Sequence, residues 1–215
     1  MTAALLQLLP ANEPLPRAAT LPYSGVMDAT PEDSALMLRY KDGDTAAFEV
    51  LYRRHNGPLY RYLLRLSLNR ATAEDLFQEV WSKIIRSRHS YRATAKFSTF
   101  LYRVAHNCFI DHVRRNKRHA SNIPLDPDNA ASPSDEPDVT AEKALARRRL
   151  IAALTALPDE QRDVFLLHEE AGLSLDIIAQ VTGVSRETAK SRLRYAVKKL
   201  KAAIIESAPE TEAAN

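Results

Sequence analysis

The segment at residues 120–140 constrains the fold most, because it cannot contribute to a hydrophobic core. It contains four prolines and five acidic residues, no basic residue and few large apolar side chains. Such a composition cannot bury enough apolar surface to fold. At about 3.4 Å per extended residue, the segment spans up to about 70 Å. The sequence therefore predicts two folded blocks joined by a flexible acidic linker.

Both blocks are predicted to be helical. Glycine is scarce, with 5 among 215 residues, and Ala, Leu, Arg and Glu are abundant, which favours helix over sheet. Leu76, Val80 and Ile84 form a stripe at helical spacing. We predict an all-α fold of two helical domains, at 28–119 and 141–205, on either side of the acidic linker.

Several residues are expected to set the limits of individual helices. Thr30 is expected to cap the first helix, and Thr72 a later one. The Asn-Gly-Pro sequence at 56–58 is expected to bend or end the helix that contains it. In the second block, Ser174 is expected to cap a short helix and Ser185 a long final helix.

The ends of the chain are expected to lie outside the folded blocks. Residues 1–27 contain four prolines and show no sustained helical period, which predicts a disordered extension. Met27 directly precedes the first helix signal and is an alternative start of the protein. Residues 206–215 carry three acids and no base, so we expect an acidic tail.

Cysteine usage and hydropathy exclude several classes of protein. The single cysteine, Cys108, allows neither a disulfide within one chain nor a metal site built on paired cysteines. His106 and His112 lie on different sides of one predicted helix, so no metal is expected there. One cysteine fits a reducing, cytoplasmic location. No apolar run approaches the roughly 20 residues of a membrane span, so no membrane insertion is expected.

The charge is segregated along the chain. The two helical blocks carry net charges of +7 and +4, whereas the linker carries −5. Two basic blocks joined by an acidic strip indicate two nucleic-acid-binding surfaces with a solvated tether between them.

Residues 174–200 match a helix-turn-helix pattern. Gly183 permits the sharp turn between two helices, and it follows the small Ala179 by four residues. Arg186, Lys190 and Arg194 share one face of the second helix. A helix of this kind contacts bases and phosphates in the major groove. The same three cations would also fit a solvated face of an ordinary core helix, but the turn and the cap favour DNA binding.

Two segments of the first block are also distinctive. Residues 97–118 mix aromatic side chains with cations, a combination that holds single-stranded nucleic acid by stacking and by phosphate contacts. Asp75, Gln78 and Glu79 occupy one side of an earlier helix. Periodicity alone would make these three residues a solvated polar face, and any one Phe of 97–118 a core residue.

Taken together, these motifs resemble extracytoplasmic-function sigma factors, which are subunits of bacterial RNA polymerase, over about residues 30–202. Three stretches carry the resemblance: Asp-Leu-Phe-Gln-Glu at 75–79; Phe-Leu-Tyr-Arg-Val-Ala-His-Asn at 100–107 with Asp111, Arg114 and Arg115; and Leu157-Pro158, Gly172-Leu173-Ser174 and Thr188-Ala189-Lys190-Ser191-Arg192-Leu193.

The resemblance implies a role for each motif. The first domain corresponds to the sigma two bundle and the second to the sigma four helix-turn-helix domain. The residues implied to bind the clamp helices of the largest core-polymerase subunit are Asp75, Gln78 and Glu79. Those implied to melt and recognise the minus-ten element are Phe97, Phe100, Arg103, Asn107, Arg114, Arg115 and Lys117, with Asn107 contacting an extruded base. Those implied to recognise the minus-thirty-five element are Ser185, Arg186, Glu187, Thr188, Lys190, Ser191 and Arg194.

The sequence departs from the family pattern at three places. Phe100 stands where the family often has Trp, which bears on either strand separation or packing. Arg186-Glu187 replaces a common Val-Gly, which bears on the base sequence recognised at minus thirty-five. Residues 1–27 match nothing in the family.

The resemblance also sets the expected partners. These are core RNA polymerase and promoter DNA. Many family members are also held by an anti-sigma protein, and the sequence leaves open whether this one is. The free chain is expected to be a monomer without a cofactor. A stand-alone helix-turn-helix regulator would usually carry an effector or receiver domain, which 30–119 does not resemble. A nucleic-acid enzyme would need a metal cluster, a phosphate loop or a nucleophile-base pair, and no such motif appears. We therefore expect a promoter-recognition subunit and not an enzyme.

Overall fold

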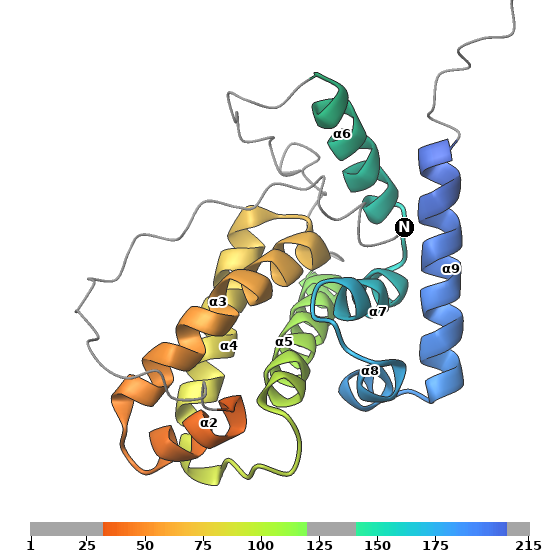
Figure 1. The fold of residues 1–215 in the computed structure, drawn as a ribbon. Coiled ribbons are helices and arrows are strands. Elements are labelled where there is room, and N and C mark those ends of the chain that lie inside the picture. The colour runs from red at the N-terminus through yellow and green to blue at the C-terminus, as the bar shows by residue number, and fades with distance from the viewer. Residues whose placement is uncertain (1–31, 120–140, 206–215) are drawn as a thin grey trace, which may run out of the picture.

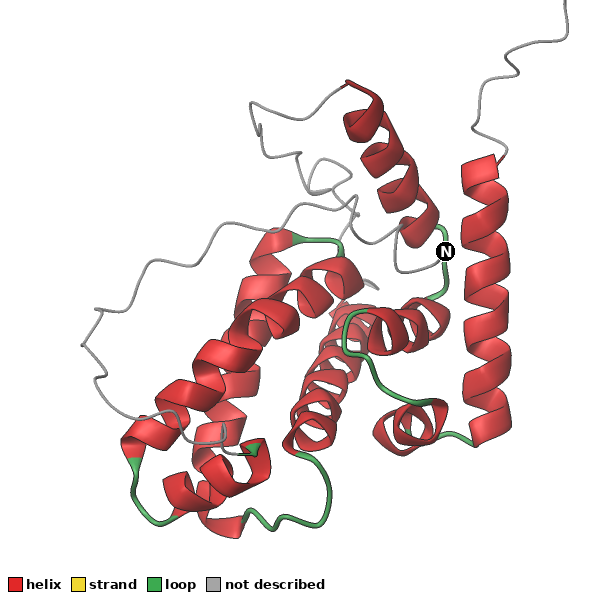
Figure 2. Cartoon of the chain, in the orientation of Figure 1, coloured by secondary structure: helices red, strands yellow, loops and turns green. Residues whose placement is uncertain are grey.

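The computed structural model describes residues 32–119 and 141–205, and every regular element within these ranges is a helix (Figure 2). The all-α prediction is therefore confirmed. The elements are α2 (Asp33–Lys41), α3 (Thr45–Ser67), α4 (Arg70–Arg86), the short 3₁₀ helix η1 (Arg88–Ser90), α5 (Phe97–His119), α6 (Ala141–Thr155), α7 (Asp159–Glu169), α8 (Leu175–Thr182) and α9 (Arg186–Ile205).

The helices α2 to α5 form the N-terminal domain, in which α4 packs against both α3 and α5 (Figure 1). An aromatic cluster joins α3 to α4. The Trp81 ring lies 5.7 Å from the Phe48 ring, edge to face, and 4.9 Å from the Tyr52 ring. Aromatic pairs of this geometry stabilise a fold by more than their buried area alone would. This cluster therefore helps to hold α4 against α3.

The helix α3 runs through Pro58, so of the two predicted outcomes, a bend or an end of the helix, residues 56–58 do not end it. Proline lacks an N–H and normally interrupts a helix at this position. Here the residues directly after it, Leu59, Tyr60, Tyr62 and Leu63, are all buried. Burial of an apolar side chain stabilises by about 1.5–3 kcal/mol, so four of them offset the local loss at the proline.

The start of α4 also differs from the prediction. The helix begins at Arg70, and Asn69 is its cap, because the Asn69 side chain accepts a hydrogen bond from the Thr72 N–H at 2.9 Å. Thr72 therefore lies inside the first turn and does not cap it. Asn and Thr are both good caps, and their order in the chain alone does not distinguish them. The Thr30 cap lies outside the described residues.

Asp33 ties α2 to α3. One carboxylate oxygen accepts a hydrogen bond from Arg54 at 2.6 Å, and the other lies 2.7 Å from His55 Nε2. Burial raises the pKa of Asp33, but the hydrogen bonds and charges of Arg54 and His55 outweigh it and lower the pKa below its usual value. A carboxylate with a lowered pKa stabilises the fold at neutral pH, and that contribution is lost as the pH falls through the pKa.

The substitution Asp33→Asn is expected to lower the free energy of unfolding by about 1–2 kcal/mol at pH 7. The difference from wild type should shrink below about pH 4, where the carboxyl is protonated in the unfolded chain. Urea titrations at several pH values measure this. Glu49→Gln, in an exposed pair with Arg53 at 3.9 Å, is the control and should change stability by less than about 0.5 kcal/mol. A pH-independent loss would contradict the assignment.

The helices α6 to α9 form the C-terminal domain, in which α9 packs against α6, α7 and α8. Gly183 adopts a left-handed conformation with φ of 68° and ends α8, as the sequence predicted. The Val184 N–H then donates to the Ala179 carbonyl at 3.2 Å, which closes the turn. Ser174 caps α8 and Ser185 caps α9 through side-chain hydrogen bonds to Ile177 and Thr188. Both predicted caps are confirmed.

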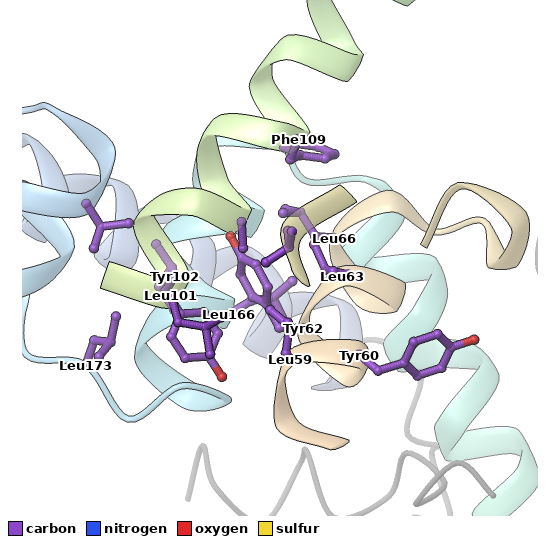
Figure 3. Packing of buried hydrophobic residues seen from close by; sticks show 14 of the residues in the cluster. Leu59, Tyr60, Tyr62, Leu63, Leu66, Leu101, Tyr102, Phe109, Leu166 and Leu173 are labelled. Atoms are coloured by element: carbon purple, nitrogen blue, oxygen red, sulfur yellow. The ribbon is translucent and has the colours of Figure 1, made fainter. Parts of the chain in front are cut away.

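The two domains pack against each other through α3 with α7 and α5 with α8. Figure 3 shows Leu166 and Leu173 of the C-terminal domain in the same group of buried residues as Tyr62 and Tyr102 of the N-terminal domain. The buried residues of both domains belong to one continuous apolar cluster. The sequence predicted two blocks that could sit far apart, whereas in this structure they share a core.

Candidate nucleic-acid interface

The exposed face of α9 is the first candidate surface. Ala189, Ala196 and Leu200 turn inward and are buried, which leaves the opposite face to solvent. Of the residues predicted for minus thirty-five, Ser185, Arg186, Glu187, Lys190 and Arg194 are exposed, and Thr188 and Ser191 are half-buried. The structure therefore brings this predicted set together at the start of one helix, where a helix-turn-helix protein contacts base edges.

Two contacts on this face escaped the sequence analysis. Asp176, in the first turn of α8, forms an ion pair with Arg186 at 2.9 Å, and Glu187 lies 3.7 Å from the same guanidinium. Tyr195 is 50% exposed, and the Arg194 guanidinium lies 5.2 Å from its ring centroid. The signal that could have located Asp176 is an acid two residues after the predicted Ser174 cap, on a helix that packs against α9.

A groove between α4 and α5 is the second candidate surface, here named the α4–α5 groove. It has a volume of about 530 Å³. Its lining combines cations, an aromatic ring and an amide: Lys83, Arg86, Ser87, Phe100, Val104, Asn107 and Asp111. A pocket with stacking and hydrogen-bonding groups beside cations suits a base extruded from the DNA stack. Phe100 and Asn107 were predicted here, whereas Lys83 and Arg86 come from α4 and were missed.

The other predicted minus-ten residues divide into two groups. Arg103, Arg114, Arg115 and Lys117 are exposed along α5. Phe97 is 1% exposed, with its ring 5.2 Å from the His55 ring. A base cannot stack on a ring that the core encloses, so the predicted DNA contact of Phe97 is corrected to a core position.

The acidic face of α4 is similarly divided. Asp75 and Gln78 are exposed. Glu79 is half-buried and pairs with Lys83 at 2.9 Å and with Arg115 at 3.5 Å. Burial raises the pKa of Glu79, but the contacts with Lys83 and Arg115 outweigh it and lower the pKa. Glu79 therefore fastens α4 to α5 through the guanidinium of Arg115, and Asp75 and Gln78 are left as the outward groups.

A second groove, here named the interdomain groove, lies where α5 meets α8. It has a volume of about 510 Å³ and is lined by Arg103, His106 and Asn107 of α5 and by residues 180–183 of α8 and its turn. Asn107 thus borders both grooves. It lines the interdomain groove together with the Gly183 turn of the helix-turn-helix motif.

Within the described ranges, no three His, Cys, Asp or Glu side chains gather as a metal site would require. None of the helices described there is long and apolar enough to cross a membrane.

The fold and these surfaces define a helix-turn-helix DNA-binding protein with a second helical domain that carries a basic, aromatic groove. Residues 51–119 match the family described as Sigma-70 region 2, and residues 147–200 match Sigma-70, region 4. The chain belongs to the extracytoplasmic-function group of sigma-70 RNA polymerase sigma factors. It is a sigma factor that directs promoter-specific transcription.

Characterised relatives cover most of the chain. RNA polymerase sigma factor CarQ of Myxococcus xanthus is 33% identical over 165 residues, which are 77% of this chain and 93% of CarQ. ECF RNA polymerase sigma factor SigE of Mycolicibacterium smegmatis is 30% identical over 203 residues, which are 94% of this chain and 72% of SigE.

Solved structures share the fold. The sigma factor RpoE of Bartonella quintana, solved with the anti-sigma factor NepR, matches with a TM-score of 0.64 at 20% identity, over 75% of this chain and 98% of RpoE. CnrH, solved with the cytosolic domain of CnrY, matches with a TM-score of 0.59 at 21% identity, over 82% of this chain and 99% of CnrH.

Proposed function

We propose that the domain at 28–119 binds core polymerase and the minus-ten element, and that the domain at 141–205 binds the minus-thirty-five element. The observation that carries this proposal is the α4–α5 groove. It places the amide of Asn107 and the ring of Phe100 beside the cations Lys83 and Arg86, which are the groups needed to hold one extruded base and its phosphates.

The chain contributes recognition and no bond-making chemistry in this proposal. Core polymerase supplies the active site, and the sigma factor supplies promoter contacts. The residues at 120–140 join the two DNA-binding domains, and residues 1–27 and 206–215 flank them. We further propose that the protein works in the cytoplasm, without a cofactor and as a monomer when free. An anti-sigma protein is a proposed regulatory partner, because RpoE and CnrH were solved with NepR and CnrY.

The decisive test mixes the purified chain with bacterial core polymerase and measures both complex formation and transcript initiation. A one-to-one complex that starts transcripts at a defined promoter supports the proposal. DNA binding by the chain alone, with no affinity for core polymerase, would instead indicate a stand-alone helix-turn-helix regulator.

The double substitution Asp75→Ala with Gln78→Ala is expected to weaken binding to core polymerase about tenfold or more and to leave the fold intact. Both side chains are exposed on α4, so their loss removes intermolecular contacts and few internal ones. Titration of core polymerase with labelled chain measures the effect. Glu49→Ala removes an exposed acid from α3 and is the control. Unchanged affinity in the double variant would contradict the docking assignment.

On α9, Arg186→Ala and Lys199→Ala are expected to have different consequences for promoter use. Arg186 lies at the start of the helix, so its loss should weaken use about tenfold in a way that depends on the base at one minus-thirty-five position. Lys199, exposed near the other end, should act through phosphate, with a uniform loss and a salt slope reduced by about one. If both variants lost promoter use equally whatever the minus-thirty-five bases, the division between a base contact by Arg186 and a phosphate contact by Lys199 would be wrong.

A further inference from the structure

A polar cluster lies at the centre of the contact between the two domains. Asp163 of α7 is 2% exposed. Tyr62 of α3 donates a hydrogen bond to one of its carboxylate oxygens at 2.6 Å, and His106 Nδ1 of α5 lies 2.6 Å from the other. Burial, followed by the Asp163 charge, raises the pKa of Tyr62 well above its usual value, so the hydroxyl keeps its proton and donates. Both oxygens of one buried carboxylate are therefore bound by the opposite domain.

A second acid, Glu170 at the C-terminal end of α7, repeats the arrangement. The Glu170 side chain is 7% exposed and pairs with Arg65 and Arg61 of α3, the latter at 3.4 Å. Burial, and then the charge of Arg61, lowers the pKa of Arg65 to about 10, which leaves it cationic at neutral pH. The C-terminal domain thus presents two acids to two cations, a hydroxyl and an imidazole of the N-terminal domain.

Once the domains are docked, both of these buried acids depend on their partners from the opposite domain. A buried carboxylate without partners costs several kcal/mol, whereas a paired and hydrogen-bonded one is tolerated. Leu166 and Leu173 of the C-terminal domain belong to the apolar cluster that both domains share. Separation of the domains would let water solvate both acids, but docking with one partner removed would leave a buried carboxylate oxygen without the partner that it has in this structure.

The closed arrangement conflicts with simultaneous contact to both promoter elements. Asn107 and Gly183 border the same interdomain groove, and α9 begins three residues after Gly183. The two elements, named for positions about 25 base pairs apart, lie about 85 Å apart at about 3.4 Å per base pair. The two DNA-binding surfaces must therefore move apart before both elements are bound.

We propose that the contacts of Asp163 and Glu170 form an autoinhibitory latch, which holds the free chain closed and must open before both promoter elements are engaged. The inhibitory role of the latch rests on the proposed function, whereas the closed arrangement of the two domains does not. If only part of the chain is open, its apparent affinity for promoter DNA is the affinity of the open form multiplied by the open fraction. If about 90% of the free chain is closed, release of the latch raises apparent promoter affinity of the holoenzyme about tenfold.

The test is small-angle X-ray scattering on the full chain at physiological salt. Glu170→Lys places a cation against Arg65 and Arg61 and is expected to increase the radius of gyration. The charge swap Glu170→Lys with Arg65→Glu should restore the wild-type value. Glu160→Lys is the matched control, because Glu160 lies on the same helix but pairs with Arg192 of its own domain at 3.1 Å, and it should remain compact.

Tyr62→Phe is the second variant, since it keeps the ring and removes the donor to Asp163. It should expand the chain without loss of helix content by circular dichroism. An expanded wild-type chain would overturn the latch, as would a Glu170→Lys variant that is folded and as compact as wild type. An expanded wild type that still initiates transcription contradicts the latch alone. A compact chain that opens on Glu170→Lys but never binds core polymerase contradicts the proposed function and, with it, the inhibitory role.

Discussion

Replacement of Phe165 by alanine is expected to lower the free energy of unfolding by about 3–5 kcal/mol. Phe165 lies in α7 and is 1% exposed, among the largest fully buried side chains of the structure. The helix α7 packs against α9, α3 and α8, and an alanine in place of this buried ring leaves a cavity that the surrounding helices fill only partly. Because domains are stable by about 5–15 kcal/mol, the variant should lose a large part of its stability.

Thermal or urea unfolding followed by circular dichroism measures this loss. Leu38→Ala is the control, since Leu38 is an apolar residue that is 39% exposed, and it should change stability by less than about 1 kcal/mol. A loss below about 1 kcal/mol for Phe165→Ala would contradict the described core of the C-terminal domain.

Replacement of Asn107 by alanine is expected to reduce promoter opening about 10–100-fold while leaving core binding unchanged. Asn107 is exposed and lines the α4–α5 groove, where its amide can both donate and accept hydrogen bonds. Loss of a paired contact to one base removes about 1–3 kcal/mol of discrimination. The reduction should therefore be largest for promoters with the preferred minus-ten base and small for promoters that lack it.

Open-complex formation on promoters that differ at one minus-ten position measures this effect. Asn116→Ala is the matched control: Asn116 is an exposed amide further along α5, and its side chain contacts His112 at 2.8 Å. Equal losses on all promoter variants would contradict a base contact by Asn107 and would indicate a phosphate or folding role.

Local chemistry explains which helix limits the sequence could predict. Ser174, Ser185 and Gly183 act within one turn of their own position, through a side-chain cap or a left-handed backbone, and all three were predicted. The outcome at Pro58 was left open and the Thr72 cap was wrong, because both depend on more distant groups. Burial of the residues after Pro58 maintains α3, and Asn69 takes the cap that Thr72 could have provided.

The same distinction holds for the candidate site. The spacing of Arg186, Lys190 and Arg194 placed them on one face, and the structure exposes all three. The aromatic character of Phe97 could not reveal that His55 and the core would enclose it. Nor could the charge of Glu79 show that Arg115, 36 residues away, would pair with it.

The sequence by itself determined the helical class, the helix-turn-helix pattern and the family, because periodicity, caps and motif order are properties of near neighbours along the chain. The tertiary structure alone decided how the domains meet. Asp163 contacts Tyr62 and His106, which are 101 and 57 residues away, and an acid inside an ordinary helix carries no mark of such partners. Packing of α7 on α3 buries this carboxylate, and a buried carboxylate must keep its partners because an unpaired buried charge is costly.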